Sequence, residues 1–341
     1  MASPARSRWI LAAVLLAVIG GVWWVRHKQP ILGEAYIGDR TAILWSTTAQ
    51  VRQTVATLHY GDHVLITRRA GDQTEVQTAA GARGWIDAHE LMEPALWKGA
   101  ADLLAKAREM PVQAAGHMRA LSNVHIEPGR DSARIFQLGR NLPVAVLARK
   151  AAEGPATPET PPDGAAAPSD AEQRKQEEWL LVLRTGTGSS SAPNASGSAP
   201  DAGDTPVAGW VLAQFVELDP PPPIGDYASS SGLRVVAWVL LNRAAGPDAK
   251  PQYVVAGTHG AARPECDFTA LRVYTWDEKR ERYETAYIEN DLCGSLPIRV
   301  RPISAGAEFT FPERDQGGAE RGYRMQMTSV RRVQATGISR H

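Results

Sequence analysis

Two stretches of the chain, GARGWIDAHELME at residues 81–93 and PVAGWVLAQFVELD at residues 206–219, have nearly the same pattern. Each runs from small residues through Gly-Trp and a β-branched residue to an apolar and acidic ending. A β-branched and aromatic run that follows a glycine is typical of a strand that follows a turn. The two stretches therefore predict one structural unit that occurs twice in the chain.

The residues around the first stretch predict a small β unit. Short alternating runs are separated by turn signals, which are Gly-Asp at residues 61–62 and 71–72 and a glycine at 81. Short strands at this spacing favour a small barrel, so we predict five strands in a first barrel at residues 33–93. Apolar residues then recur at helical spacing, which predicts an amphipathic connecting helix at residues 94–112.

The second copy is predicted at residues 116–219 and contains two inserts. Residues 150–177 are rich in Ala, Pro, Glu and Lys, and residues 186–207 are rich in Gly, Ser, Ala and Pro. Such segments bury too little apolar surface to offset the entropy of ordering, which predicts disordered loops. Without these two inserts the second copy is close in length to the first. Strand-connecting loops tolerate insertions, so inserts of this kind are compatible with a repeated unit.

Both copies resemble bacterial SH3-like (SH3b) domains, which are small five-stranded barrels common in bacterial envelope proteins. In the second copy the resemblance lies in NVHIEPG at residues 123–129, in Glu178-Trp179 and in GWV at 209–211. In the first copy it lies in GWI at 84–86. The resemblance implies that the barrels recognise a peptide or a cell-wall ligand in a groove between strand-connecting loops.

The first copy departs from the SH3b pattern at two places. It has AILWSTTAQ at residues 42–50 where the early Asn-Val stretch is expected. It also has Gln73 and Thr74 near the place of the tryptophan on the penultimate strand. Both departures weaken the transfer of a family binding surface to this copy.

The candidate ligand-binding residues are aromatic. They are Trp85 and Trp210 of the two Gly-Trp motifs, Trp179 of the second copy and Tyr60 of the first. Aromatic rings on small barrels often line binding grooves, but a ring on a strand after a turn glycine also packs in barrel cores. The sequence leaves both interpretations of these rings open.

The N-terminal residues 1–28 are predicted to anchor the chain in a membrane. Residues 9–25 contain no charge and, as a helix, span about 25 Å, close to the thickness of a bilayer core. A cleaved signal peptide, a lipoprotein and a buried helix are the alternatives, but the run lacks a good cleavage site and a cysteine. We predict an uncleaved anchor in the inner membrane, with the bulk of the chain periplasmic or otherwise extracytoplasmic.

The last third of the chain is predicted to be a separate β domain. A Pro- and Ser-rich stretch at residues 220–232 predicts a linker. The β-rich runs that follow, at residues 233–335, favour a sandwich or a barrel. Cys266 and Cys293 flank a predicted hairpin, and an even pair in an exported chain predicts a disulfide. This bond would contribute about 3 kcal/mol to the free energy of unfolding.

Several kinds of chemistry are disfavoured by the residues present. Lys plus Arg and Asp plus Glu both number 37, so the formal net charge of +0 argues against nucleic acid as a partner. His59 and His63 lie on a predicted turn without a third ligand, so we predict no metal site. No phosphate-binding loop or other cofactor motif is present, so we predict no cofactor.

The stretch PECDFTALRVY at residues 264–274 superficially resembles the nucleophile region of the cysteine peptidases that often accompany envelope SH3b domains. The neighbouring Glu265 and Asp267 would raise the pKa of a Cys266 thiol, and the only later histidine is His341. We therefore predict that the chain is not an enzyme and that it binds or scaffolds, with peptidoglycan or an envelope protein as partner. The alternatives are a hydrolase with its active site in the C-terminal domain and a single-span envelope sensor.

Overall fold

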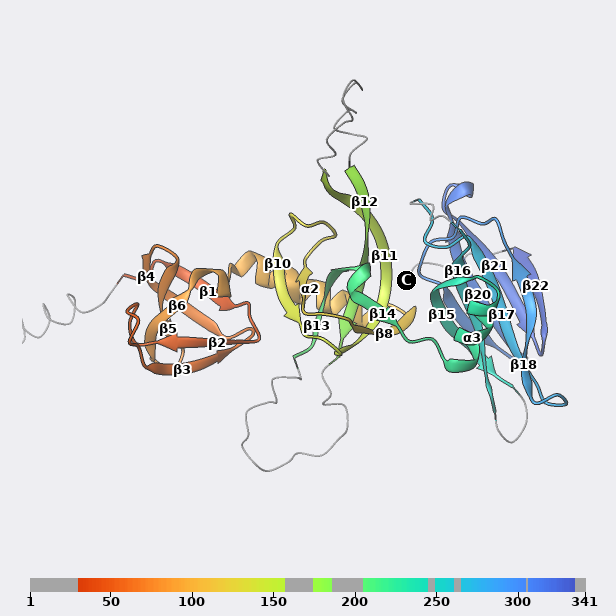
Figure 1. Ribbon diagram of the computed structural model, residues 1–341, viewed down its shortest axis with the longest axis horizontal. Helices are drawn as coiled ribbons and strands as arrows, with labels where there is room; N and C mark the ends of the chain where they lie inside the picture. The colour runs from red at the N-terminus through yellow and green to blue at the C-terminus, as the bar shows by residue number, and fades with distance from the viewer. Residues whose placement is uncertain are drawn as a thin grey trace, which may run out of the picture. The chain divides into compact units, whose positions relative to one another are not determined.

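The computed structural model describes residues 30–156, 174–185, 205–244, 249–260, 265–304 and 306–334. Its regular structure is mostly β-strand, which confirms the predicted all-β class. The chain divides into two compact units, Met1–Pro94 and Ala95–His341. Figure 1 shows the sheets of both units and their labels.

The first unit contains one sheet of seven strands, which we call the first repeat. Its strand order is β3-β2-β6-β5-β4-β1-β7, and the short 3-10 helix η1 (Ala88–Glu90) precedes β7. Alternate residues of these strands point into an apolar core, so the period-2 pattern of the sequence places the core. The strands are β1 (Gly33–Ile37), β2 (Thr41–Trp45), β3 (Thr54–His59), β4 (His63–Ala70), β5 (Gln73–Thr78), β6 (Arg83–Asp87) and β7 (Leu91–Met92).

The second repeat is a seven-stranded sheet with the same architecture. Its order, β10-β9-β13-β12-β11-β8-β14, is the order of the first repeat with every strand number raised by seven. Both copies have a bulge in the equivalent strand, between Ile66 and Arg68 and between Val146 and Ala148. The elements of the second repeat are β8 (Ala114–Met118), β9 (Ser122–His125), β10 (Arg134–Leu138), β11 (Pro143–Ala156), β12 (Arg174–Arg184), β13 (Val207–Leu212), η2 (Ala213–Phe215) and β14 (Val216–Leu218).

The first insert of the second repeat begins later and ends earlier than predicted. Strand β11 runs to Ala156 and β12 begins at Arg174, so both strands extend into the predicted loop at 150–177. The two strands pair with each other along this extension, which satisfies their backbone groups despite the polar composition. Residues 157–173 and 186–204 lie outside the described residues.

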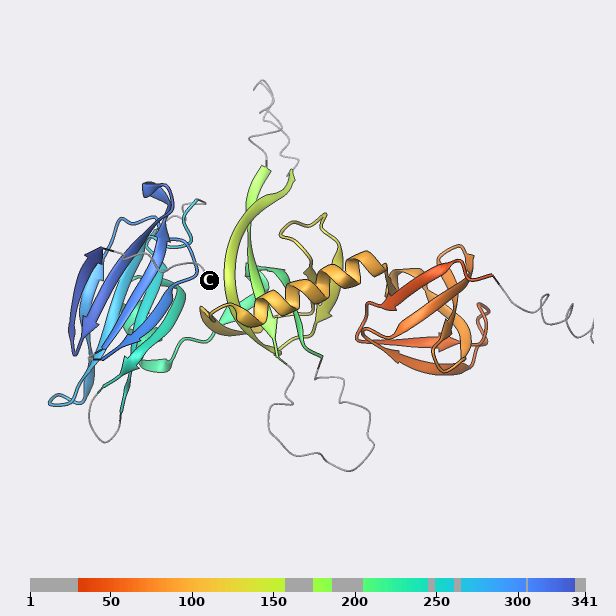
Figure 2. The ribbon, with the colours of Figure 1, turned by 180° about the vertical axis from the view of Figure 1, so that it is seen from behind.

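Helix α2 (Pro94–Glu109) covers one face of the second repeat, as Figure 2 shows. Its apolar side and the sheet share one hydrophobic cluster. The helix and the segment after it contribute Leu103, Leu104, Ala107 and Met110, and the sheet contributes Ala145, Leu147, Ala148, Leu181, Leu183, Ala208 and Trp210. This burial holds α2 on the second repeat, because the amphipathic helix removes its apolar stripe from water there.

The C-terminal domain is a sandwich of two four-stranded antiparallel sheets. Residues from both sheets form one core, which includes Val254, Phe309 and Tyr323. The sheets are β15-β16-β17-β18 and β19-β20-β21-β22. The strands are β15 (Arg234–Arg243), β16 (Pro251–Thr258), β17 (Ala270–Asp277), β18 (Arg282–Glu289), β19 (Arg299–Ile303), β20 (Gly306–Glu313), β21 (Ala319–Gln326) and β22 (Ser329–Gln334), with η3 (Arg314–Gln316) after β20.

Two predictions for this region have different outcomes. Cys266 and Cys293 form a disulfide, which confirms the predicted bond. The stretch at 220–232, predicted as a linker, instead contains helix α3 (Pro222–Ser230). The helix forms because prolines are tolerated in a first turn, and because Ile224 and Ala228, one helical turn apart, are both fully buried.

Within the second unit, Gln113 joins the second repeat to the C-terminal sandwich. Its side chain is fully buried, accepts a hydrogen bond from the Ile298 N–H at 2.7 Å and donates one to the Ile298 carbonyl at 3.2 Å. The backbone carbonyl of Gln113 also accepts a 2.8 Å bond from the Trp238 N–H. The side chain and the backbone of Gln113 therefore both bond to backbone groups of the C-terminal sandwich.

The predicted membrane span at residues 9–25 lies outside the described residues. In the part of the chain that the structure describes, no helix has the length and apolar character needed to cross a bilayer.

Candidate ligand-binding surface

The Gly-Trp motif brings two strands of the first repeat close together. Trp45 of β2 and Trp85 of β6 are direct cross-strand partners. A Cβ atom on Gly84 would lie only 2.5 Å from the Trp45 carbonyl oxygen and 2.7 Å from Leu44 Cγ. Only glycine allows this approach, because no Cβ atom fits so close to a backbone oxygen. The glycine faces the core, and the tryptophan that follows it faces outward.

Two arginines lie over the two tryptophan rings. The guanidinium carbon of Arg52 is 4.1 Å from the centre of the Trp45 ring, and that of Arg68 is 5.9 Å from the centre of the Trp85 ring. Glu75 lies between Trp85 and Arg68 in the cross-strand row. We call these five residues the two-tryptophan surface. Both rings are partly exposed, and the adjoining Ile43 and Val55 are 39% and 42% exposed.

The guanidinium groups of this surface retain free donor capacity. Among the described residues, neither Arg52 nor Arg68 lies within ion-pair distance of a carboxylate. A guanidinium that lies over a ring keeps its N–H donors, whose fork geometry matches a carboxylate. The surface therefore offers apolar area and anion-binding donors together, which suits a ligand that carries both apolar groups and carboxylates.

The candidate aromatic residues from the sequence occupy different environments. Trp85 belongs to the two-tryptophan surface, whereas Trp210 packs against the cluster under α2. Trp179 is 1% exposed and meets the His125 ring edge-on, with 5.3 Å between ring centres. Tyr60 lies at the β3–β4 turn, where burial raises its pKa to about 12. Thus of the four rings only Trp85 belongs to this surface.

Trp45 was not among the candidate residues of the sequence, although it is one of the two tryptophans of this surface. Its partnership with Trp85 joins strands that are far apart in the chain. In the second repeat the equivalent partner of Trp210 is His125. The internal repeat itself could have indicated this position, once the strand order of one copy was known.

A second polar cluster ties the two sheets of the C-terminal sandwich. Arg321 of β21 forms ion pairs with Glu289 of β18 and Glu313 of β20. Glu289 also accepts hydrogen bonds from Tyr287 at 2.9 Å and Tyr323 at 2.5 Å. Burial, followed by the hydrogen bond to Glu289, raises the pKa of Tyr287 to about 12 and also raises the pKa of Tyr323. The Oε2 atom of Glu313 is buried and has no hydrogen-bond partner in the described chain.

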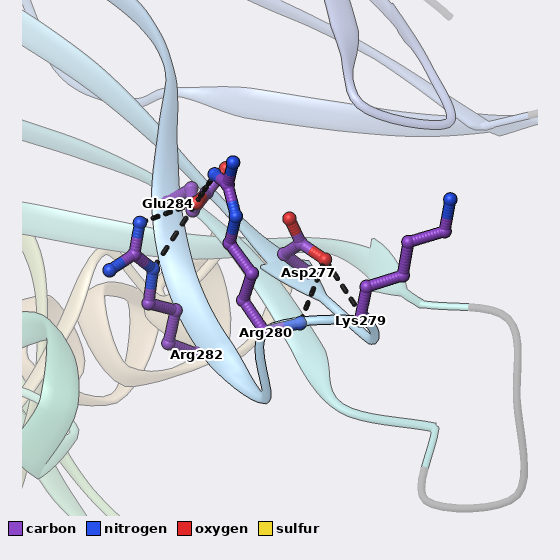
Figure 3. Close-up of polar contacts among 5 residues, drawn as sticks. All are labelled: Asp277, Lys279, Arg280, Arg282 and Glu284. Carbon is purple, nitrogen blue, oxygen red and sulfur yellow. Dashed lines mark hydrogen bonds and ion pairs between the residues drawn. The ribbon is translucent and has the colours of Figure 1, made fainter.

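The turn between β17 and β18 carries a charged network at the surface, shown in Figure 3. Glu284 accepts hydrogen bonds from Arg280 at 2.6 Å and Arg282 at 3.0 Å. The hydrogen bond from Arg280, then that from Arg282, lowers the pKa of Glu284. Asp277 accepts bonds from the backbone N–H groups of Lys279 and Arg280 and so orders the turn. Exposed pairs of this kind contribute little to stability.

The described parts of the chain contain no site for metal or thiol chemistry. No group of three or more His, Cys, Asp or Glu side chains that could hold a metal ion occurs in those parts. The disulfide occupies both cysteines, so neither is a free thiol in this structure.

Comparisons with known proteins place this chain in no family. No family model matches it, and no curated protein matches it. Among solved structures it is similar to NlpC2 from Trichomonas vaginalis, at 11% identity and a TM-score of 0.17, over 89% of this chain and 96% of that chain. It is also similar to an NlpC/P60 family protein from Bacillus cereus ATCC 10987, at 8% identity and a TM-score of 0.21, over 90% and 95% of the two chains.

One prediction is corrected by this comparison. The sequence predicted that the chain is not an enzyme, and that prediction is contradicted by the NlpC/P60 proteins among its structural neighbours. We therefore withdraw it.

Proposed function

We propose that this chain is a cell-envelope protein that binds a carboxylate-bearing peptide on its two-tryptophan surface. In this proposal the two repeats are SH3-like barrels, and residues 9–25 anchor the chain with its bulk outside the cytoplasm. The peptide belongs either to the wall or to an envelope protein.

The observation that supports the proposal is the pair of arginines that lie over the pair of tryptophans. Each guanidinium lies over a ring and has no carboxylate of the described chain within ion-pair distance. Contact with a ring restricts an arginine side chain before a ligand arrives, so less side-chain entropy is lost when a carboxylate binds. Partly exposed tryptophans supply the apolar contact, as at many binding surfaces.

The test measures the affinity of the full-length chain for a fluorescein-labelled peptide of Glu-Leu-Gly repeats by fluorescence anisotropy. We expect Arg52→Gln and Arg68→Gln each to weaken binding about tenfold, the worth of one charge-assisted hydrogen bond. Arg282→Gln, at the exposed β17–β18 turn, is the matched control and leaves the affinity unchanged. Equal binding of a peptide with Lys in place of Glu, or no effect of Arg52→Gln, would contradict the proposal.

Hydrolysis in the C-terminal domain is a second candidate, and the Glu289–Arg321–Glu313 cluster is the observation that favours it. Two carboxylates and two tyrosines converge there, and the Oε2 atom of Glu313 is left without a partner. Paired carboxylates are the usual acid and base of hydrolases. Release of soluble fragments from purified peptidoglycan by the full-length chain, lost in Glu313→Gln, would support this candidate, and no release by the wild type would exclude it for this substrate.

A further inference from the structure

The second repeat shows what kind of element the equivalent outer face accepts. There, helix α2 lies across β11, β12 and β13 and packs on Leu181, Leu183 and Ala208. Trp210, the equivalent of Trp85, packs against the same cluster. The outer face of this fold therefore accommodates an amphipathic helix, and the outward tryptophan of the Gly-Trp motif lies beside it.

The first repeat has the same face with different chemistry. Leu181 pairs with Trp210 as Glu75 pairs with Trp85, so these two positions are equivalent. By the same register Leu183 corresponds to Gln77 and Ala208 to Arg83. In the first repeat the apolar area lies instead at Trp45 and Trp85 and at the exposed Ile43 and Val55. Arginines 52, 68 and 83 stand around it.

The position of this surface within the sheet favours a helix over an extended peptide. A bound strand adds to a sheet through backbone groups at an edge, and the edge strands of the first repeat are β3 and β7. Trp45 and Trp85 lie on the inner strands β2 and β6 and project from the face. A face is contacted by side chains, and an amphipathic helix presents its apolar side chains as a stripe.

We propose that the two-tryptophan surface docks an amphipathic helix of a partner protein, with an apolar stripe on the tryptophans and acidic residues beside it. The proposal rests on the function proposed above and specifies its ligand. The apolar stripe covers Trp45, Trp85 and Ile43, and the acidic flank pairs with the guanidinium groups of Arg52 and Arg68. The partner helix lies on the first repeat as α2 lies on the second, and the arginines favour a helix whose flank is acidic.

The chain itself supplies the probe for the test. The probe is a labelled peptide of the α2 sequence, Pro94–Glu109, with Lys98, Lys106 and Arg108 replaced by Glu and a side-chain staple that holds it helical. The native α2 peptide with the same staple is the charge control. The acidic peptide with Leu103→Pro and no staple is the helix control. Each is titrated with the full-length chain and followed by fluorescence anisotropy.

We expect the acidic helical peptide to bind at least tenfold more tightly than either control and than the Glu-Leu-Gly peptide. Arg52→Gln weakens that binding about tenfold, and because Arg52 is exposed the variant keeps the wild-type melting temperature. Trp85→Ala is the second variant, with folding verified by circular dichroism. Arg282→Gln remains the unaffected control.

Three results would overturn the proposal. If the acidic helix and its proline-containing version bind equally, the ligand is not recognised as a helix, although peptide binding itself stands. If no peptide binds and only purified peptidoglycan does, both this proposal and a peptide ligand fail. If the full-length chain forms dimers in sedimentation and Arg52→Gln abolishes them, the occupant is a second copy of the chain.

Discussion

The two repeats share a strand order and differ in what lies on their outer faces. Inward residues are equivalent in kind, with Ile37, Val76 and Ile86 in one core and Met118, Val182 and Val211 in the other, all nearly without exposure. Outward residues differ, since the second repeat is apolar under α2 and the first is aromatic and charged. The comparison teaches that the inward pattern specifies this fold and that the outward pattern specifies what the sheet contacts.

Exchanging one pair of equivalent outward residues should produce the largest effect. Leu181 is 4% exposed beneath α2, so Leu181→Glu buries an unpaired carboxylate and should cost about 4 kcal/mol of the free energy of unfolding. Glu75→Leu loses only the hydrogen bond from Thr67 and should change that free energy by about 1 kcal/mol or less. Urea denaturation measures both. Equal costs would show that the two outer faces do not differ as described.

The glycine of the Gly-Trp motif should be the next most sensitive position. Gly84→Ala places a Cβ atom 2.5 Å from a backbone oxygen and should cost about 3 kcal/mol in urea denaturation. Gly209 is the counterpart, since a Cβ there would lie 2.8 Å from the His125 carbonyl oxygen. Gly33→Ala is the control, because a Cβ at Gly33 has no neighbour within 4 Å. A tolerated Gly84→Ala would remove the structural reason for the motif.

Leu32 and Gln113 occupy equivalent places before the first strand of each repeat, and they should respond differently. Their backbone N–H groups donate 2.8 Å bonds to the equivalent carbonyls of Ile66 and Val146. Gln113→Leu leaves the buried N–H and carbonyl of Ile298 without their side-chain partner and should lower the free energy of unfolding by about 2 kcal/mol. Leu32 is 58% exposed, so Leu32→Gln should cost no more than about 0.5 kcal/mol. Denaturation curves of the two variants compare the positions directly.

Tyr60 should give the smallest effect, visible only at high pH. Burial raises its pKa to about 12 in the folded chain, above the ordinary value of 10.0. An acid with a raised pKa favours the neutral form when folded, so its stability contribution is full below pH 10 and is lost as the pH rises toward about 12. The free energy of unfolding should fall less steeply over this window in Tyr60→Phe than in the wild type. Identical slopes would show that Tyr60 is not buried.

Much of this architecture is predictable from local sequence. Alternating apolar residues identify the strands, and the recurrence of Gly-Trp identifies the repeat before any strand is paired. Local sequence does not predict the extension of β11 and β12, because the pairing of the two strands stabilises residues whose composition predicts a loop. Helix α3 is missed for a similar reason, since it buries Ile224 and contacts β15, a strand outside its own segment.

The candidate surface is predictable only in part. Trp85, Trp179 and Trp210 are equally plausible ring residues in the sequence, yet one lies on a surface, one inside a core and one beside a helix. Their environments depend on partners distant in the chain, which local patterns do not contain. Trp45 joins the surface only through its pairing with Trp85.

The decisive measurement for the two-tryptophan surface is the affinity of the full-length chain for the acidic α2 peptide, determined by anisotropy with and without the double change Arg52→Gln and Arg68→Gln. We expect the double variant to keep the wild-type melting temperature and to bind at least tenfold more weakly. A dissociation constant unchanged by the double variant would contradict the assignment of the two-tryptophan surface as a binding site.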